Sequence, residues 1–253
     1  MLIDNKGSSR QLVEKCITCP GMRHCLPHGL KGNEMERVSD MVKHRRPFQR
    51  GEQITMMGDE FTSLMVVHSG FVKSYKVSRD GEQQIVGFYM SGDVLGVEGI
   101  STGNYGYTAE ALETTSVCTL SFRNYEYCSS HFPVMQKWLL NTMSRQIIDE
   151  QKMLLMLGKM SAEQRIANFL LDMSRRMSAS GTSIQTIRLP MSRIDIANYL
   201  GLVVETVSRL LTRLQANDIL IVKRRVISIM DLNRLQAIAD NSIEDCHPLH
   251  HAA

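Results

Sequence analysis

The sequence predicts an α+β protein with an N-terminal antiparallel β-roll, a long helix and a C-terminal winged helix-turn-helix. Three observations give this fold class: glycines divide residues 43–122 into short β-rich pieces, no Gly or Pro interrupts 134–157, and 193–213 fits a helix-turn-helix. The 253 residues suit two domains, since a domain commonly has roughly 100 to 200 residues. The expected ranges are 1–30 for a cysteine-rich segment, 31–132 for the roll, 133–160 for the helix, 161–240 for the winged helix-turn-helix and 241–253 for a disordered tail.

The predicted roll is clearest in one hairpin. Residues 70–77 form its first strand, Arg79-Asp80-Gly81 its turn and 83–89 its second strand. The glycines that follow, up to Gly106, indicate further short strands and turns, as in an antiparallel sandwich or roll.

The segment 134–157 is rich in Met, Leu, Ile and Gln and predicts one helix. Apolar residues recur along it at alternating steps of three and four, which is the pattern of a coiled-coil dimer. The alternative is a stripe that faces the protein's own core. Gly158 and Ser161 then indicate a hinge before an amphipathic helix at 162–177. The dimer seam consists of Leu140, Met143, Ile147, Glu150, Leu154 and Leu157.

Residues 193–213 fill every position of a helix-turn-helix, with Ala197 where the two helices touch and Gly201 in the turn. The second helix presents Glu205, Ser208 and Arg209 on one face, where Arg can bind guanine and Glu can accept from cytosine. The alternative is a solvated face with a Glu205–Arg209 ion pair. The candidate DNA contacts on this helix are Glu205, Thr206, Ser208, Arg209 and Arg213.

Two short strands, at 219–222 and 226–230, follow the helix-turn-helix and predict a hairpin with a basic tip. Lys223 and Arg224 at this tip are candidates for phosphate contacts, which strengthen binding without reading sequence. Net charge agrees: residues 161–240 carry eleven Lys or Arg against seven Asp or Glu, a balance of +4, whereas 41–160 balance to zero. A basic surplus of this kind permits double-stranded DNA as a partner.

The start of the chain lacks a positively charged segment followed by an apolar one, and no apolar run approaches the roughly 18 residues of a membrane span. We therefore expect a cytoplasmic protein without membrane contact. Disulfides are rare in that compartment, so clustered cysteines indicate metal or redox ligands.

Cys16, Cys19 and Cys25 form such a cluster with the pattern Cys-x2-Cys-x5-Cys. Thiolates in this arrangement suit an iron–sulfur cluster or zinc. Zinc sites usually have two close pairs of ligands, so zinc is the alternative here. A fourth thiolate must come from elsewhere, and Cys118 and Cys128 are both candidates, although a buried Cys is often only a small apolar residue.

From about Cys16 to Asp240 the chain resembles the fumarate and nitrate reduction regulator (FNR) branch of the cyclic-AMP receptor protein superfamily. The resemblance rests on several motifs taken together. They are the cysteine run, Cys118, Gly87-Phe88, Ala111-Leu112-Glu113-Thr114, Ser174-Arg175-Arg176, Asn198 to Leu202 and Glu205 to Leu211.

This resemblance implies a roll like that of cyclic-nucleotide-binding proteins and a [4Fe–4S] cluster held by Cys16, Cys19, Cys25 and Cys118. It also implies that Glu205, Ser208 and Arg209 read a TTGAT-like half-site in an inverted repeat. Cluster assembly without oxygen promotes dimerisation and DNA binding in such regulators of anaerobic metabolism genes, and oxygen reverses both. A further implied partner is RNA polymerase, for which the tip at 78–82 is a candidate surface.

Cyclic-nucleotide control is disfavoured, because Gly92-Asp93 and Tyr107-Thr108 stand where the nucleotide-binding branch has a Gly-Glu pair and a phosphate-binding Arg. An enzyme is also disfavoured, since the chain has no phosphate-binding Gly-rich loop, no His-Glu-x-x-His and no nucleophile elbow. The alternative function is a zinc- or disulfide-controlled regulator of the same fold.

We also expect the dimer seam to be marginal on its own. Glu150 falls at an inward position, where it would face its twin from the second subunit, and two buried like charges are costly. Cluster assembly would then shift the equilibrium towards the dimer.

Overall fold

The computed structural model describes residues 16, 30, 32–179 and 186–240. Cys19, Cys25 and the expected tail at 241–253 therefore lie outside the described residues.

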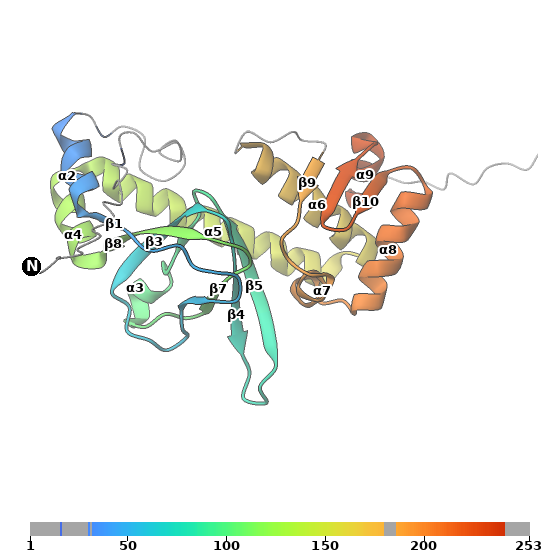
Figure 1. Ribbon diagram of the computed structural model, residues 1–253, viewed down its shortest axis with the longest axis horizontal. Helices are drawn as coiled ribbons and strands as arrows, with labels where there is room; N and C mark the ends of the chain where they lie inside the picture. Colours follow the sequence, from blue (N-terminus) through green and yellow to red (C-terminus); the bar gives the residue numbers. More distant parts are fainter. Residues whose placement is uncertain (1–15, 17–29, 31, 180–185, 241–253) are drawn as a thin grey trace, which may run out of the picture.

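Two four-stranded antiparallel sheets face each other and form the roll (Figure 1). Their inner faces enclose an apolar core that includes Met65 and Val67 from one sheet and Val72 and Ala111 from the other. The expected hairpin is confirmed as β4 (Phe71–Val77) and β5 (Gln83–Met90), with Gly81 at a φ of 83° in the turn. The first sheet has the order β1 (Val42–His44), β8 (Ser116–Ser121), β3 (Ser63–Ser69), β6 (Val94–Leu95), and the second β2 (Gln53–Thr55), β7 (Thr108–Ala111), β4 (Phe71–Val77), β5 (Gln83–Met90).

Helices cover the outer face of the first sheet. α2 (Asn33–Met41), α4 (Phe122–His131) and the beginning of α5 (Pro133–Lys159) share one apolar cluster with β3 and β8, while the short α3 (Gly99–Thr102) follows β6. Ser121 caps α4 because its hydroxyl accepts a hydrogen bond from the amide of Asn124 at 3.2 Å.

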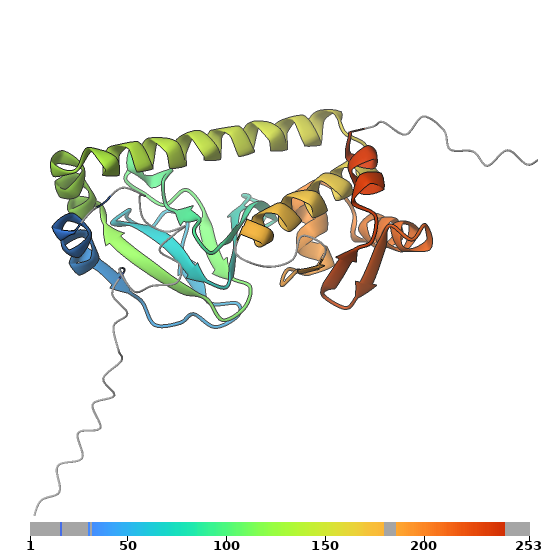
Figure 2. The same ribbon diagram turned by 90° about the horizontal axis from the view of Figure 1, so that it is seen from above.

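α5 confirms the predicted long helix, and Figure 2 shows it running along the molecule from the roll to the C-terminal half. The break expected around Gly158 and Ser161 is present, because α5 ends at Lys159. Only Met160 and Ser161 separate it from α6 (Ala162–Ala179). Gly158 is exposed and a methyl group there would meet nothing, so the position does not force the helix to end.

The C-terminal half contains β9 (Thr186–Arg188), α7 (Arg193–Leu200), α8 (Val204–Ala216), β10 (Leu220–Lys223), β11 (Val226–Ile229) and α9 (Leu232–Ala239). Its three strands form a small antiparallel sheet in the order β10, β11, β9, which confirms the predicted basic hairpin. The apolar core of this half continues into the roll through Tyr75, Ile85 and Phe88. No helix among the described residues is long and apolar enough to span a membrane.

Candidate nucleic-acid interface and cysteine site

The helix-turn-helix has the geometry that its sequence predicts. Gly201 ends α7 in the left-handed region, at a φ of 61°, and Ala197 is buried between the two helices. The hydroxyl of Ser192 accepts from the amide of Asp195, whose carboxylate accepts from the amide of Ser192. This capping box fixes the start of α7. The pattern Ser192-x-x-Asp195 carries that signal in the sequence.

The recognition face of α8 is open. Glu205 and Arg209 are exposed, and a shallow groove beside them is lined by Ser208, Arg209, Thr212, Arg213 and Ala216. The Glu205–Arg209 ion pair of the alternative interpretation is absent among the described residues; Arg209 instead donates to the hydroxyl of Thr206 at 3.4 Å. Glu205 and Arg209 are thus both available to an external ligand.

Two arginines near α8 lie differently from what the sequence suggested. Arg213 is ion-paired with Glu163 of α6, so this candidate DNA contact already has a partner. Arg193, which was not proposed from the sequence, extends from α7 and donates to the hydroxyl of Ser208 at 3.2 Å. Arg193 therefore belongs to the same surface as the recognition face.

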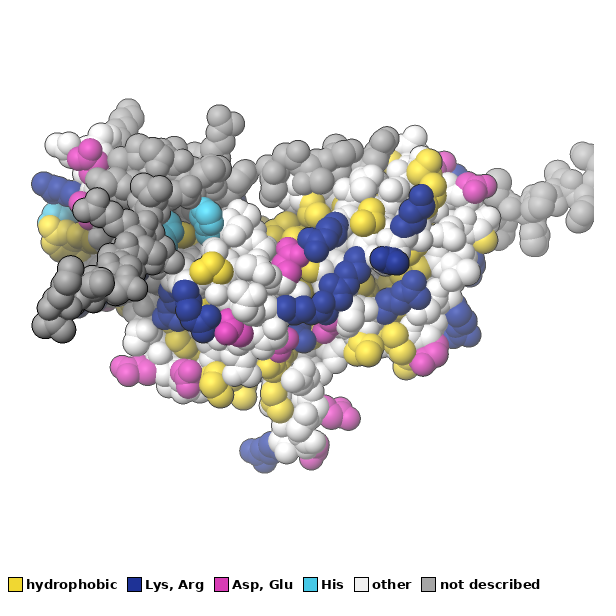
Figure 3. Space-filling model, in the orientation of Figure 1, with side chains coloured by type: hydrophobic (Ala, Val, Ile, Leu, Met, Phe, Trp, Pro, Cys, Tyr) yellow, Lys and Arg dark blue, Asp and Glu magenta, His cyan; other side chains and the backbone are white. Residues whose placement is uncertain are grey.

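The basic hairpin tip is exposed beside this surface. Lys223, Arg224 and Arg225 are all solvent-exposed, and Arg224 has a φ of 56°, the left-handed conformation of the turn. Figure 3 shows Lys and Arg side chains gathered over the half of the molecule that carries β9, β10, α7 and α8. The exposed side chains of α8 and the basic hairpin tip thus lie on one half of the molecule.

Cys16 and Cys118 both lie at the outer face of the first sheet. The amide of Cys16 donates to the hydroxyl of Ser39 in α2 at 3.0 Å, and the side chain belongs to the apolar cluster that covers this face. Cys118 is opposite Val66 in the strand pairing, and Val66 belongs to that same cluster. Because directly opposed residues project from one face, Cys118 projects towards the side on which Cys16 packs.

His44 is a neighbour of Cys118 that sequence reasoning missed. The two residues are opposed in the β1–β8 pairing, and the Nδ1 atom of His44 is 3.3 Å from the Sγ atom of Cys118. The ring of His68 stands edge-on to that of His44, with centroids 6.2 Å apart. No local spacing could have found this contact, because 74 residues separate His44 from Cys118.

Cys128, the other candidate ligand, belongs to the same apolar cluster as Cys16 but lies on α4 rather than on the sheet. It is fully buried in α4, where its Sγ atom lies 3.4 Å from the Sδ atom of Met41, and burial raises the pKa of its thiol. A raised pKa disfavours the thiolate that binds metals. Among the described residues no three His, Cys, Asp or Glu side chains converge on one point.

The predicted seam of α5 is exposed on the single chain. Leu140, Ile147 and Leu154 are 66%, 52% and 71% exposed, so the alternative of a stripe facing the protein's own core is wrong for them. The core is contacted instead by Met135, Leu139 and Met156. Met143 and Glu150 are also exposed.

Leu157 differs from the rest of the seam. It is half-buried, and a methyl group added at Gly201 would lie 3.3 Å from its Cδ2 atom. The last residue of the seam therefore packs beside the turn of the helix-turn-helix. Ile148 and Leu155 are exposed apolar residues of α5 that the predicted seam did not include.

Gly92-Asp93 and Tyr107-Thr108, which stand where the nucleotide-binding branch has its ligands, make separate contacts in this chain. Asp93 forms an ion pair with Arg176 of α6 at 2.5 Å, and the hydroxyl of Thr108 accepts from the amide of Met57. Tyr107 lies under the ammonium group of Lys76, 4.8 Å from the ring centre.

Glu98 adds negative charge to the region of Tyr107. Its carboxylate accepts from the amide of Gly106 at 3.3 Å, while burial, together with the charge of Glu150, raises its pKa. Burial, Glu150 and Glu98 also raise the pKa of Tyr107. The region around Tyr107 thus holds the carboxylate of Glu98 together with the ammonium group of Lys76.

Comparison with known proteins agrees with this geometry. A model of the cyclic nucleotide-binding domain matches residues 45–127, and a model of the Crp-like helix-turn-helix domain matches 164–238. The transcriptional activator protein FnrA of Stutzerimonas stutzeri is 42% identical over 229 residues, which cover 90% of this chain and 94% of that protein. The fumarate and nitrate reduction regulatory protein of Salmonella typhimurium is 37% identical over 227 residues, 90% of this chain and 91% of that protein.

A solved structure supports the same assignment. FixK2 from Bradyrhizobium japonicum is similar with a TM-score of 0.71 and 31% identity, covering 78% of this chain and 96% of that chain. The α+β fold class and the family resemblance are thus both confirmed, and the chain belongs to the FNR branch of the Crp family of transcription regulators.

Proposed function

We propose that this protein is an oxygen-responsive regulator of anaerobic metabolism genes that binds a TTGAT-like inverted repeat as a dimer. A [4Fe–4S] cluster held by Cys16, Cys19, Cys25 and Cys118 is its sensor. The observation that carries the proposal is that the described cysteines of this set, Cys16 and Cys118, lie at the same covered face of the roll.

The recognition face supports sequence-specific DNA binding. Glu205, Ser208 and Arg209 project from α8 near a hairpin with exposed basic residues. Arg209 suits the O6 and N7 atoms of guanine, Glu205 suits the amino group of cytosine, and Lys223 and Arg224 suit phosphates. Two copies bound about 34 Å apart would occupy two half-sites of an inverted repeat.

The donor chemistry fits an iron–sulfur cluster. Cys118 is nearly buried, which limits solvent access, and the His44 ring beside it can donate a hydrogen bond to a thiolate. The cluster would supply an oxygen-sensitive link between the N-terminal segment and the roll. All three described cysteines are buried, and Cys118 rather than Cys128 is assigned to this set on the family resemblance.

The cysteine site is connected to the dimer helix through packing. Cys16 belongs to the same apolar cluster as Met135 and Leu139 of α5, and Leu139 directly precedes the first seam residue, Leu140. Anchoring the N-terminal segment would therefore order the beginning of the seam. Because Glu150 opposes association, this added order would decide whether two chains pair.

Other properties of the proposal follow from the surfaces. The tip at 78–82 is exposed at the end of the β4–β5 hairpin, where it could contact RNA polymerase. The carboxylates of Glu98 and Glu150 disfavour the phosphate of a cyclic nucleotide in the neighbouring region. We propose regulation of transcription rather than catalysis, in keeping with the relatives' names.

The test combines spectroscopy with DNA binding. Protein purified without oxygen and supplied with iron and sulfide should absorb broadly near 400 nm and bind a duplex with two inverted TTGAT half-sites. Exposure to air should remove both the absorbance and the binding. Colourless protein that contains zinc and binds the duplex equally in air would favour the zinc-controlled alternative.

A further inference from the structure

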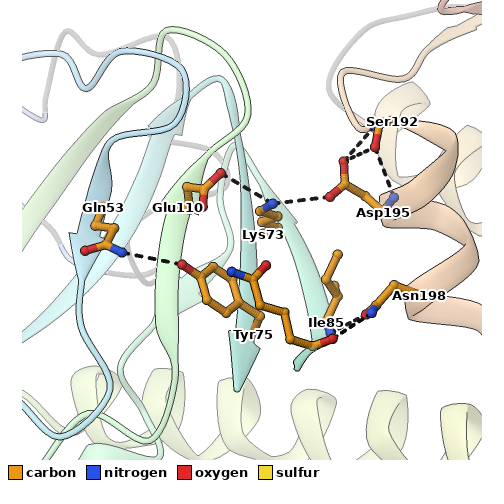
Figure 4. A network of polar contacts seen from close by, with 9 residues as sticks. Gln53, Lys73, Tyr75, Ile85, Glu110, Ser192, Asp195 and Asn198 are labelled. Carbon is orange, nitrogen blue, oxygen red and sulfur yellow. Dashed lines mark hydrogen bonds and ion pairs between the residues drawn. The ribbon is translucent and has the colours of Figure 1, made fainter. Parts of the chain in front are cut away.

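The first helix of the helix-turn-helix is attached to the roll of its own chain. β5 is an edge strand of the second sheet, and Asn198 of α7 binds its backbone (Figure 4). The side-chain oxygen of Asn198 accepts from the amide of Ile85 at 2.6 Å, and its Nδ2 donates to the carbonyl of Gln83 at 2.7 Å. In return, Gln84 donates to the backbone carbonyl of Asn198 at 3.0 Å. One side-chain amide thus pairs with β5 as a neighbouring strand would.

A buried charge cluster lies beside this contact. The ammonium group of Lys73, on β4, is 3.2 Å from Asp195 of α7 and 3.4 Å from Glu110 of β7. These three side chains are only 12% to 20% exposed. Burial opposes the charge of Lys73, but the two carboxylates outweigh it and raise its pKa. The cluster is therefore held in its charged form, and loss of Lys73 would leave both carboxylates without the ammonium group that they share.

Asp195 has two roles in this cluster. Its Oδ2 atom accepts from Ser192 in the capping box, and its Oδ1 atom accepts from Lys73. The Lys73–Asp195 ion pair therefore holds the N-terminal end of α7 on the sheet, whereas Asn198 holds the helix about one turn further along. Two separated attachments resist both sliding and rotation of α7 on the sheet.

Apolar packing completes the attachment. The ring of Phe88 on β5 lies 5.0 Å from that of Tyr199 and 6.2 Å from that of Phe169 in α6, measured between centroids. Ile85 and Phe88 belong to the core of the C-terminal half. The polar contacts fix the orientation of α7 on the sheet, and the aromatic contacts exclude water from the same junction.

From this geometry we infer that Lys73 and Asn198 are positioning residues for DNA recognition. They hold α7, and with it α8, in one orientation relative to α5 within each subunit. Since α5 carries the dimer seam, this attachment sets the distance between the two recognition helices. The roll is thus part of the device that selects half-site spacing, and the inference rests on the proposed binding of DNA as a dimer.

The experiment uses the full chain, supplied with iron and sulfide without oxygen, and duplexes with inverted TTGAT half-sites. One duplex has half-site centres about 10 base pairs apart, and the others are longer or shorter by about one or two. Wild-type protein should prefer one separation. Asn198→Ala and Lys73→Met should lose about tenfold in affinity at that separation and bind the other duplexes almost equally well, while sedimentation shows an unchanged dimer.

Two further variants separate positioning from general destabilisation. Lys73→Arg keeps the buried charge and should retain the spacing preference. Arg46→Gln removes an ion pair with Glu52 that lies on the roll alone, and it should change nothing. Equal weakening of Asn198→Ala on every duplex, or an unchanged preference, would overturn the inference.

Hydrogen exchange tests the attachment without DNA. The Ile85 amide should exchange faster in Asn198→Ala than in wild type, because it loses its acceptor. Unchanged exchange at Ile85 would overturn the attachment itself. Failure of the wild-type protein to bind any duplex would instead count against the proposed function, while the exchange result would still judge the attachment.

Discussion

The helix-turn-helix and the cysteine site differ in how far apart their parts lie along the chain. The recognition unit is contained in residues 192–213, and its turn glycine and contact alanine occupy the predicted places. The proposed cysteine site draws on Cys16 and Cys118, which are far apart in the sequence, and strand register places His44 beside Cys118. The comparison teaches that local spacing is sufficient where adjacent helices build a surface, whereas pairing of distant strands decides the sensor site.

The largest effect is expected at the proposed cysteine site, whose residues are far apart in the sequence. Cys118→Ala should reduce iron from about four atoms per chain to well below one, because the cluster loses its proposed fourth thiolate. Cys128→Ala is the matched control, since it removes a buried thiol that packs against Met41. Iron and sulfide analysis after anaerobic reconstitution measures both. Full iron in Cys118→Ala together with loss in Cys128→Ala would reverse the assignment.

A substitution in the helix-turn-helix should reduce discrimination between DNA sequences. Arg209→Ala should cost about 1 to 3 kcal/mol for the cognate half-site relative to one with its guanine replaced. The residue is exposed, and among the described residues its side chain donates one long hydrogen bond, of 3.4 Å to Thr206, so the fold should not be affected. Competition binding with the two duplexes measures the ratio. An unchanged ratio would remove Arg209 from the base-reading set.

Lys223→Ala should behave differently from Arg209→Ala. An exposed lysine at the hairpin tip that contacts phosphate should weaken binding to both duplexes alike. The slope of log affinity against log salt should become shallower by about 0.9. A salt titration on the two duplexes measures this change, and a selective loss on the cognate duplex would contradict a phosphate contact.

Much of the fold follows from sequence, but contacts between distant elements do not. The β4–β5 hairpin, α5 and the basic hairpin are each encoded by neighbouring residues, through turn glycines or helical spacing. The attachment of Asn198 to Ile85 joins residues that are 113 positions apart, and no pattern in the sequence links the two. α5 ends at Lys159, between Gly158 and Ser161, the two residues that mark the break in the sequence.

The candidate site was predicted as a set of residues more fully than as a set of contacts. Exposure of Glu205 and Arg209 agrees with their proposed role, but the pairing of Arg213 with Glu163 depends on how α6 crosses α8. Glu98 near Glu150 was missed for the same reason, since the roll and α5 meet only in three dimensions.

A smaller effect is expected in the dimer helix that joins the two regions. Glu150→Ala should increase dimer formation severalfold in protein without iron, because it removes one like-charged pair from the seam. Asp149→Ala is the control, since Asp149 is exposed and paired with Lys152 on the helix surface. Sedimentation equilibrium measures both variants. A Glu150→Ala variant that remains monomeric would contradict the like-charge explanation.

The smallest effect concerns Glu98 and pH. Burial first, and then the charge of Glu150, raises its pKa above 4.5, so the folded chain binds a proton more tightly than the unfolded chain. Stability should fall as pH rises from 4.5 through the raised pKa. Glu98→Gln should flatten this dependence and stabilise the protein near neutral pH, with little gain at about pH 4. Urea unfolding across this range measures the effect, and a parallel pH curve for the variant would contradict it.

The most direct test of the sensing account is the oligomeric state of wild-type protein on its operator, with and without iron and sulfide, in the absence of oxygen. Analytical ultracentrifugation with a labelled duplex reports pairing and DNA binding together. The account predicts dimers on the duplex only when iron and sulfide are bound, and monomers that leave the duplex free when they are not. Iron-free protein that pairs and binds the same duplex with equal affinity would contradict it.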